Sequence, residues 1–343
     1  MPQSQLLERT RLRRRSCALV FISLSIVCAI ASPAARSDSA AGVSAPHPHG
    51  GHESRAGARA HGAIKLAITV DDLPGGGPEV LGYTHVHMVK DIIAALHAHR
   101  VPHPAGFIVG SMLETRSDRS VALDAWVHAG FLVGNHTYSH DRIAELGVTR
   151  FMDDITKNRS VVDPLEKRAA QTQRYFRFPY LEEGATPQER HALWQLLQRE
   201  RYSLVRVSVT FSDTDWADAY LRCQQTGDTQ SLQALDRSYR SQALANLHWS
   251  VEAADEILGR AIPHVLLLHV NVPTAKNLDA LLHLYEAQGV QFIPLEAALR
   301  DPAYAAYYDV PGGDLLSQAS AALGRPHTPR VAAVDDLIDR LCR

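Results

Sequence analysis

The sequence of 343 residues predicts an α/β fold in which parallel strands alternate with helices. Two observations lead to this prediction: seven short apolar segments of strand length recur along the chain, and helical stretches lie between most of them. Hydrophobic residues make up 45% of the chain and charged residues 21%. This is a globular composition, which excludes a mostly disordered, collagenous or polytopic membrane protein. An open sheet and a barrel share this local pattern, so both remain open.

The first strand is predicted at residues 64–70, where Ile64, Leu66, Ile68 and Val70 alternate with residues of the opposite face. An amphipathic helix is predicted next, with one apolar face formed by Val86, Val89, Ile92, Ile93 and Leu96. The remaining strands are predicted at residues 105–109, 131–135, 174–178, 204–209, 265–270 and 291–293. Further helices are predicted at 187–201 and 277–288, and the stretch 217–260 is interpreted as mostly helical and polar.

A glycine-rich loop, Leu73-Pro74-Gly75-Gly76-Gly77-Pro78, separates the first strand from the first helix. No Gly-Lys-Ser/Thr follows it, and the spacing GxGxxG is absent from it. Because a phosphate-binding loop needs one of these patterns, we interpret it as a plain flexible loop.

The N-terminal residues have the layout of a secretory signal peptide. A block of arginines at positions 9–15 precedes an apolar run at residues 17–31, which is shorter than a transmembrane helix requires. We therefore expect a signal peptide at 1–31, an Ala/Gly/His-rich linker at 32–62, a barrel or sheet domain at 63–300 and a C-terminal extension at 301–343. An uncleaved anchor is the alternative to export into the periplasm or medium with no lasting membrane insertion.

The formal net charge of −2 gives no reason to expect a nucleic-acid partner. The cysteine content fits an exported protein. After removal of the signal peptide only Cys223 and Cys342 remain. Two cysteines in an oxidising compartment can form a disulfide, but the sequence does not show whether they are close in space, so their pairing is left open.

Two sequence motifs contain candidate metal ligands. In His136-Thr-Tyr-Ser-His140 a spacing of four places both imidazoles on one face of a helical turn. The pair Asp71-Asp72 directly follows the first predicted strand, where α/β folds place their active sites. One carboxylate can complete a three-ligand metal site, and the other can remain a general base. Two His and one carboxylate also fit non-haem iron, so the ligand types do not identify the metal.

The spacing of the two histidines is weak evidence by itself, because 18 His in this chain produce about one such pair by chance. A second pair, His99 and His103, is interrupted by Pro102 and has no acidic residue beside it in the sequence. We expect this second pair to be unrelated to the metal site.

Three later segments also place polar residues at or just beyond the carboxyl ends of predicted strands. They are Arg177-Phe-Pro-Tyr180, Asp213-Thr-Asp215-Trp216 and the segment that ends at His269. Because the carboxyl ends of parallel strands meet at one end of a sheet or barrel, we expect these side chains to converge with the first two motifs.

The ordered set TVDD, HTYSH, RFPY, DTDW and LLLH resembles the five motifs of the polysaccharide deacetylases, carbohydrate esterase family four, over about residues 64–299. The resemblance implies a distorted, incomplete (β/α) barrel of about seven parallel strands. It also implies removal of acetyl groups, usually N-acetyl from the amino sugars of chitin, peptidoglycan or exopolysaccharide, and sometimes O-acetyl from xylan. An acetylated polysaccharide or oligosaccharide is therefore the expected partner.

The resemblance also implies roles around the metal. Asp72, His136 and His140 match the ligands of a divalent metal, usually zinc, with cobalt or another divalent ion as alternatives. Asp71 matches the general base that activates water, and Arg177 matches the residue that holds this base in place.

The remaining matches concern the oxyanion, the leaving group and the acetyl methyl group. The backbone N–H of Tyr180 matches the oxyanion donor, and Tyr180 also borders the substrate. His269 matches the general acid that protonates the leaving amine, and Asp215 matches the acid that tunes it. Trp216 and Leu267 match the apolar wall around the acetyl methyl group.

The sequence departs from the family pattern in ways that affect the expected substrate. Leu73-Pro74 stands where many members have glycine, and both the stretch 217–268 and the tail after Asp301 are longer than usual. An acetyl ester or small amide is therefore an alternative substrate, and a non-catalytic carbohydrate-binding protein is a further alternative. The glycan, the native metal and the oligomeric state are left open.

Overall fold

A computed structural model describes residues 63–80, 82–114, 116–307, 309–327 and 335–343, all of which belong to one compact unit, Arg59–Arg343. The predicted signal peptide and linker lie outside the described residues. Seven parallel strands form one sheet: β1 (Ile64–Leu73), β2 (Ala105–Ile108), β3 (Leu132–Asn135), β4 (Arg174–Phe176), β5 (Tyr202–Leu204), β6 (His264–His269) and β7 (Val290–Phe292). All seven predicted strands are present, which confirms the predicted fold class.

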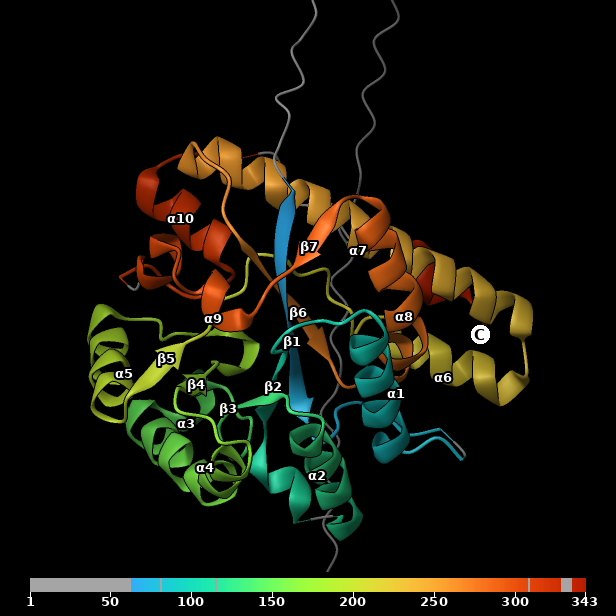
Figure 1. Cartoon of the computed structure of the whole chain (residues 1–343), viewed down its shortest axis with the longest axis horizontal. Helices are drawn as coiled ribbons and strands as arrows, with labels where there is room; N and C mark the ends of the chain where they lie inside the picture. The colour runs from blue at the N-terminus through green and yellow to red at the C-terminus, as the bar shows by residue number, and fades with distance from the viewer. Residues whose placement is uncertain (1–62, 81, 115, 308, 328–334) are drawn as a thin grey trace, which may run out of the picture. The chain divides into compact units, whose positions relative to one another are not determined.

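The sheet has the order β5-β4-β3-β2-β1-β6, and β7 pairs with the beginning of β1. Figure 1 shows β1 in blue at the centre of the molecule. The strand predicted at 204–209 is found earlier, at Tyr202–Leu204, and shares only Leu204 with the predicted range. Beyond it the chain crosses to β6, where Val209 accepts a backbone hydrogen bond of 3.0 Å from Leu267. Here an irregular bridge replaces a regular strand pairing, so the fold is a distorted, incomplete (β/α) barrel.

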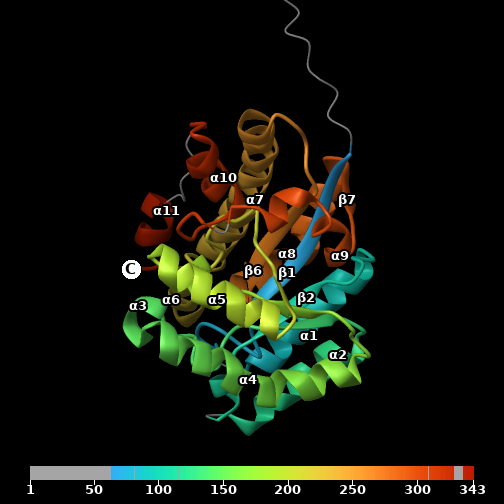
Figure 2. The ribbon, with the colours of Figure 1, turned by 90° about the vertical axis from the view of Figure 1, so that its left-hand side faces the viewer.

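Helices cover the outside of the barrel (Figures 1 and 2). They are α1 (His85–Ala98), α2 (Ser120–His128), α3 (Ile143–Leu146), α4 (Val148–Arg168), α5 (Pro187–Arg199), α6 (Ala217–Thr226), α7 (Thr229–Leu258), α8 (Val272–Ala287), α9 (Leu295–Ala298), α10 (Leu315–Leu323) and α11 (Asp335–Arg340). Four short 3-10 helices are η1 (Gly110–Leu113), η2 (Ser117–Arg119), η3 (Pro179–Leu181) and η4 (Pro302–Ala305). No helix among the described residues is long and apolar enough to cross a bilayer.

The stretch 217–260, predicted as mostly helical, forms two helices rather than one. Gly227, at a φ of 69°, ends α6 in the left-handed conformation that glycine adopts without steric cost. The side chain of Asp228 then accepts a hydrogen bond from the N–H of Ser231 and begins α7. Cap residues therefore explain the break.

The alternation of β1 separates two apolar layers. Leu66, Ile68 and Val70 pack outward in a core that includes residues of α1 and α8. Ala67, Thr69 and Asp71 occupy the alternate positions of the strand, and Ala67 packs in a second core that includes Phe107. This alternation positions the site, because it places Asp71 on the face opposite the outer helices.

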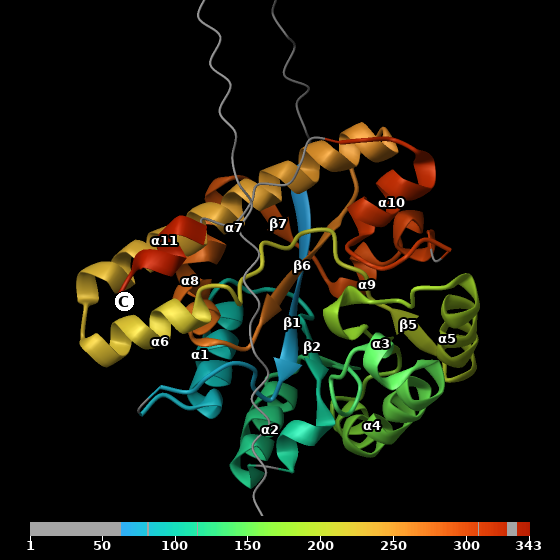
Figure 3. The same ribbon diagram turned by 180° about the vertical axis from the view of Figure 1, so that it is seen from behind.

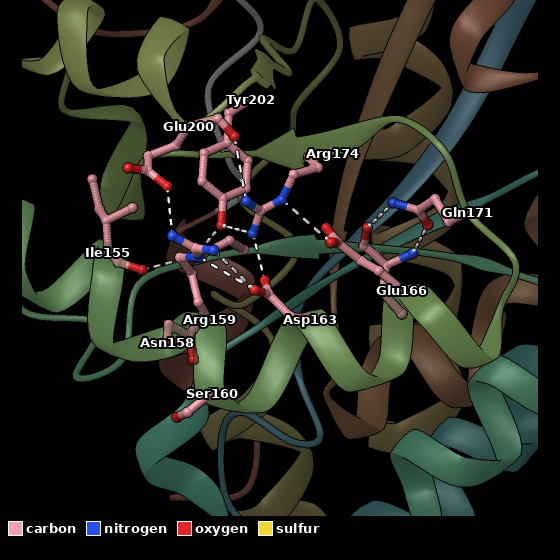
Figure 4. A network of polar contacts seen from close by, with 12 residues as sticks. Ile155, Asn158, Arg159, Ser160, Asp163, Glu166, Gln171, Arg174, Glu200 and Tyr202 are labelled. Atoms are coloured by element: carbon pink, nitrogen blue, oxygen red, sulfur yellow. Dashed lines mark hydrogen bonds and ion pairs between the residues drawn. The ribbon is translucent and has the colours of Figure 1, made fainter.

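A network of polar contacts ties α4 to strands β4 and β5 (Figure 4). Arg174 at the start of β4 donates hydrogen bonds to Asp163 and to the hydroxyl of Tyr202. Burial raises the pKa of Glu166 in the same network to about 7, against the attraction of Arg174. The Tyr202 hydroxyl also accepts a hydrogen bond of 2.9 Å from Asn135, the last residue of β3. The network therefore reaches the strand end that carries the first histidine motif.

The C-terminal extension is bound to the rest of the fold by hydrogen bonds and by a disulfide. The buried side chain of Arg206 donates to the carbonyls of Tyr304 and Ala306 and pairs with the buried carboxylate of Glu183. Farther on, a disulfide joins Cys223 of α6 to Cys342, two cysteines whose pairing the sequence left open. Figure 3 shows α11 beside α6 and α7, where this disulfide lies.

Candidate metal and catalytic site

The side chain of Asp71 is held on the inner face of the barrel by Arg177. Nη1 of Arg177 donates to Oδ1 of Asp71 at 2.7 Å and to the hydroxyl of Thr69 at 2.8 Å, and its Nε donates to the carbonyl of Val205. Both charged side chains are buried. Because Oδ1 accepts the hydrogen bond from Arg177, the second carboxylate oxygen of Asp71 is not used in this bond. That oxygen, Oδ2, lies 3.5 Å from Nε2 of His136.

The three predicted metal ligands come together. Asp72, His136 and His140 each place one ligand atom within 4.8 Å of the other two. Oδ1 of Asp72 lies 3.8 Å from Nε2 of His136 and 3.3 Å from Nε2 of His140. This oxygen is buried and accepts no hydrogen bond among the described residues. A buried carboxylate oxygen without a donor is what an absent cation would leave behind.

The protonation of His136 also suits a metal ligand. Its Nδ1–H donates to the carbonyl of Arg177 at 2.9 Å, which turns the lone pair of Nε2 toward Asp72. Burial, together with the charge of His140, lowers the pKa of His136 to about 3. The imidazole is therefore neutral near pH 7, as coordination requires. The residues present fit a divalent cation such as zinc.

The segment that carries both histidines is a loop and not the predicted helical turn. His136–His140 follows β3 without helical structure, and Thr137 and His140 have φ angles of 62° and 63°. The loop is fixed by Asp154, which accepts hydrogen bonds from the N–H groups of Tyr138 and Ser139. The two imidazole rings nevertheless lie 4.9 Å apart. The structure therefore brings the predicted residues together, but through a loop and not through the predicted helical turn.

Positive φ angles recur at residues of the site. Asp72 has a φ of 64° and Tyr180 a φ of 55°, like the two residues of the histidine loop. Non-glycine residues in this region cost on the order of 1–3 kcal/mol each, and they gather where a site requires them.

The triple-glycine loop packs tightly behind the ligands. A Cβ atom on Gly76 would lie 2.9 Å from Oδ2 of Asp72, and one on Gly75 would lie 2.2 Å from the ring of His85. The N–H of Gly76 also donates to the carbonyl of Val270. The interpretation as a plain flexible loop is therefore wrong, because close approach to these two side chains explains the glycines.

His269 stands beside Asp71 on the neighbouring strand, since the two residues are register partners of β6 and β1. Its acidic partner is Asp213, and the prediction of Asp215 in this role is wrong. Nδ1 of His269 lies 2.7 Å from Oδ1 of Asp213, whose Oδ2 accepts a hydrogen bond from the backbone N–H of His269. Asp213 is buried, whereas Asp215 is exposed. A turn in which the N–H of Asp215 donates to Ser212 (φ of 54°) separates the two carboxylates.

Although burial alone would lower it, the pKa of His269 rises to about 10. The causes are the charge and hydrogen bond of Asp213 and the charges of Asp72 and Asp71. His269 is therefore protonated at neutral pH and able to donate a proton.

The predicted substrate-facing residues divide into two groups. Tyr180 is 50% exposed, and its ring lies 4.8 Å from that of His140 and beneath the guanidinium of Arg142. Leu267 is buried two residues before His269, on the same face of β6.

Trp216 does not line the site as predicted. Its side chain is fully buried and packs against Phe211 and Tyr239 in the core near α6 and α7. Asp215, the residue before it, is exposed to solvent, whereas Trp216 packs in the core at the start of α6.

Two residues at the candidate site are not singled out by the sequence analysis. Asp213 lies in the DTDW motif, but its contact with His269 is visible only in the structure. Asn135 accepts a hydrogen bond from the N–H of Thr137 and another from Nδ2 of Asn158, which braces the start of the histidine loop. Both asparagines are fully buried. A polar residue at the end of an apolar strand was the available signal for Asn135.

His99 and His103 contact different partners. His103 pairs with Glu296 at the surface, whereas His99 is buried beside Asp279 and Glu286 of α8. The two histidines do not form a pair, as expected, but acidic residues that are distant in the sequence do lie beside each of them.

Comparison with known proteins supports the family stated from the motifs. Residues 58–196 match the family model described as polysaccharide deacetylase. The matched part of the chain is similar to this family, and it includes Asp71, Asp72, His136, His140 and Arg177. No curated protein matches the chain.

Solved structures of this family resemble the chain only distantly. A CE4 family pseudoenzyme from Bacillus anthracis, BA3943, is 15% identical over 70% of this chain and 66% of its own, with a TM-score of 0.47. The peptidoglycan N-acetylglucosamine deacetylase Bc1960 is 19% identical over 68% and 87%, with a TM-score of 0.44. PdaA of Bacillus subtilis, a family 4 carbohydrate esterase, is 19% identical over 69% and 81%, with a TM-score of 0.41. Likenesses this distant say nothing about substrate, so function has to be argued from the residues.

Proposed function

We propose that this protein is an exported, metal-dependent deacetylase that hydrolyses N-acetyl groups of an amino-sugar polysaccharide. One observation carries the proposal. Asp71, held by Arg177, and His269, held by Asp213, are partners on adjacent strands and flank the cluster of Asp72, His136 and His140. Amide hydrolysis requires a base for water and an acid for the leaving nitrogen, and these two groups meet that requirement.

Asp72, His136 and His140 would hold the metal. A divalent ion bound there supplies Lewis acidity, which polarises the acetyl carbonyl and makes water a stronger acid. The ligand set fits zinc, and cobalt or another divalent ion is also compatible with it.

The proton transfers belong to the protein's own side chains. Oδ2 of Asp71 accepts a proton as a water oxygen attacks the acetyl carbon, while Arg177 keeps Oδ1 in place. The backbone N–H of Tyr180 donates to the oxygen that becomes negative. Nε2 of His269 then protonates the sugar nitrogen as the C–N bond breaks, which yields acetate and a free amine. Asp213 holds Nδ1 of His269 throughout, so that Nε2 remains the donor.

Export rests on the sequence of residues 1–31 and on the disulfide. A disulfide between Cys223 and Cys342 persists in an oxidising compartment, which agrees with a periplasmic or secreted location. N-terminal sequencing of the protein recovered from cells should begin near Ser32. An intact Met1 on protein found in the cytoplasm would contradict export.

Acetate release tests the proposed reaction. N-acetylated chitooligosaccharides, peptidoglycan and acetylxylan are each incubated with the protein and added zinc or cobalt. We expect acetate from an N-acetylated glycan and much less from acetylxylan. Acetate from acetylxylan alone would instead favour an O-acetyl esterase. Glycan binding without acetate release from any substrate would indicate a non-catalytic carbohydrate-binding protein.

A further inference from the structure

A second cluster of potential metal ligands lies on the outside of the barrel, where the end of α1 meets α8. It consists of His99, Asp279 and His283, which each place one ligand atom within 4.8 Å of the other two. Nε2 of His99 lies 3.3 Å from Oδ1 of Asp279, and the rings of His99 and His283 lie 4.5 Å apart. Nothing in the proposed deacetylation uses these residues.

Helix geometry brings the three side chains together. Asp279 and His283 are four residues apart in α8, so they lie on one face of that helix. His99 ends α1, the helix that packs beside α8. Its side chain is only 4% exposed, which limits the positions that the imidazole can take. The site thus has one fixed ligand and two that are more exposed.

A fourth residue orients the buried imidazole. Oε2 of Glu286 lies 3.0 Å from Nδ1 of His99, on the side of the ring away from Asp279. A carboxylate in this position fixes the proton on Nδ1 and leaves the lone pair of Nε2 for a metal, as the carbonyl of Arg177 does for His136. The second cluster therefore shares two features with the cluster of Asp72, His136 and His140. Each has two His and one Asp, and in each a hydrogen-bond acceptor contacts Nδ1 of the buried His.

We propose that His99, Asp279 and His283 form a second divalent-metal site, whose ligand types zinc accepts. Two imidazoles and one carboxylate are ligands that zinc accepts. The side chains of Asp279 and His283 are 66% and 72% exposed, so water has access to the remaining coordination position. The bound ion would join the end of α1 to α8. Helix α1 follows β1, which carries Asp71 and Asp72, and helix α8 follows β6, which carries His269. The ion would therefore link the two helices that come directly after these strands.

Metal stoichiometry tests the site without reference to activity. The full chain is stripped with a chelator and dialysed against zinc, and bound zinc is measured for the wild type, His283→Ala, His136→Ala and the double variant. Relative to the wild type, we expect each single variant to lose one equivalent and the double variant to lose two. His248→Ala, at an exposed position of α7, is the matched control and should bind as much zinc as the wild type. Zinc held by the histidines of residues 32–62 is common to all variants and cancels in these differences.

Two further measurements separate a metal site from a set of ion pairs. Zinc should raise the melting temperature of His136→Ala, which keeps only the second site, and should raise that of the double variant less. Glu286→Gln should keep the ligands but weaken zinc binding at this site about 10- to 100-fold. Equal zinc content in His283→Ala and the wild type would overturn the proposal, as would an equal zinc-induced shift in the double variant and His136→Ala. The cluster would then be only a buried histidine between two carboxylates.

Discussion

Nδ1 of His269 lies 2.7 Å from Oδ1 of Asp213, a residue that also binds the backbone N–H of His269 and the side chains of Asn271 and Thr274. The carboxylate is therefore anchored at several points and cannot follow the imidazole if that ring moves. Such an anchor fixes both the direction of the ring and its charge.

Replacing Asp213 should change the pH dependence of deacetylation. The pKa of His269, about 10, is raised chiefly by Asp213 against the effect of burial. A general acid acts only when protonated, so activity falls as the pH rises through this pKa. Asp213→Asn removes the charge and should move the basic limb of kcat/KM to lower pH. Asp215→Asn is the control, and an equal shift in both variants would contradict the assignment.

His269 should matter more for amides than for activated esters. A sugar amine leaves only with a proton, whereas an aryl oxide of low basicity leaves without help. His269→Ala should therefore reduce hydrolysis of an N-acetyl glycan much more than hydrolysis of an aryl acetate, measured by acetate or phenol release. If both substrates slowed by the same factor, His269 would not be the general acid.

Metal content should depend on His136, the buried histidine among the three proposed metal ligands. His136→Ala removes the ligand whose Nε2 faces Oδ1 of Asp72, so it should lose about one equivalent of metal and nearly all activity. His103→Ala, at the exposed pair with Glu296, should lose neither. Elemental analysis of both purified variants checks the prediction, and full occupancy in His136→Ala would refute this ligand.

The buried ion pair of Arg206 and Glu183 should contribute to stability, because Arg206 also binds the C-terminal extension through the carbonyls of Tyr304 and Ala306. Glu183→Gln leaves the guanidinium of Arg206 buried without its counter-charge, which should cost about 3–5 kcal/mol of unfolding free energy. Asp124→Asn breaks the exposed pair with Arg168 and should change stability by roughly 0.5 kcal/mol or less. Urea unfolding of both variants gives the comparison. Equal losses would mean that the Arg206 pair does not hold the extension in place.

Much of the fold was predictable because apolar segments of strand length mark each strand of the barrel, from Ile64 to Phe292. The position of the candidate site at the carboxyl ends of these strands was predictable because such ends converge in α/β folds. Loop geometry was not, since the turn at Ser212, with its positive φ, separates Asp213 from Asp215, and composition carries no trace of this turn. The pairing of Cys223 with Cys342, 119 residues apart, also depends on tertiary structure alone.

Residues that pack against the candidate site could not be predicted from the sequence either. Gly76 is glycine because Asp72 lies against it, and the two buried asparagines at 135 and 158 bind each other across separate elements. Such residues become recognisable only when their neighbours are known.

The most direct test of the proposed mechanism is acetate release by Asp71→Asn, with metal content measured on the same preparation. The substitution keeps the size of the side chain, but an amide cannot accept a proton from water, and all three metal ligands remain. We expect an N-acetylated glycan to release acetate with the wild type and almost none with Asp71→Asn, while both bind the same amount of metal. Turnover by Asp71→Asn close to that of the wild type would contradict the assignment of Asp71 as the base.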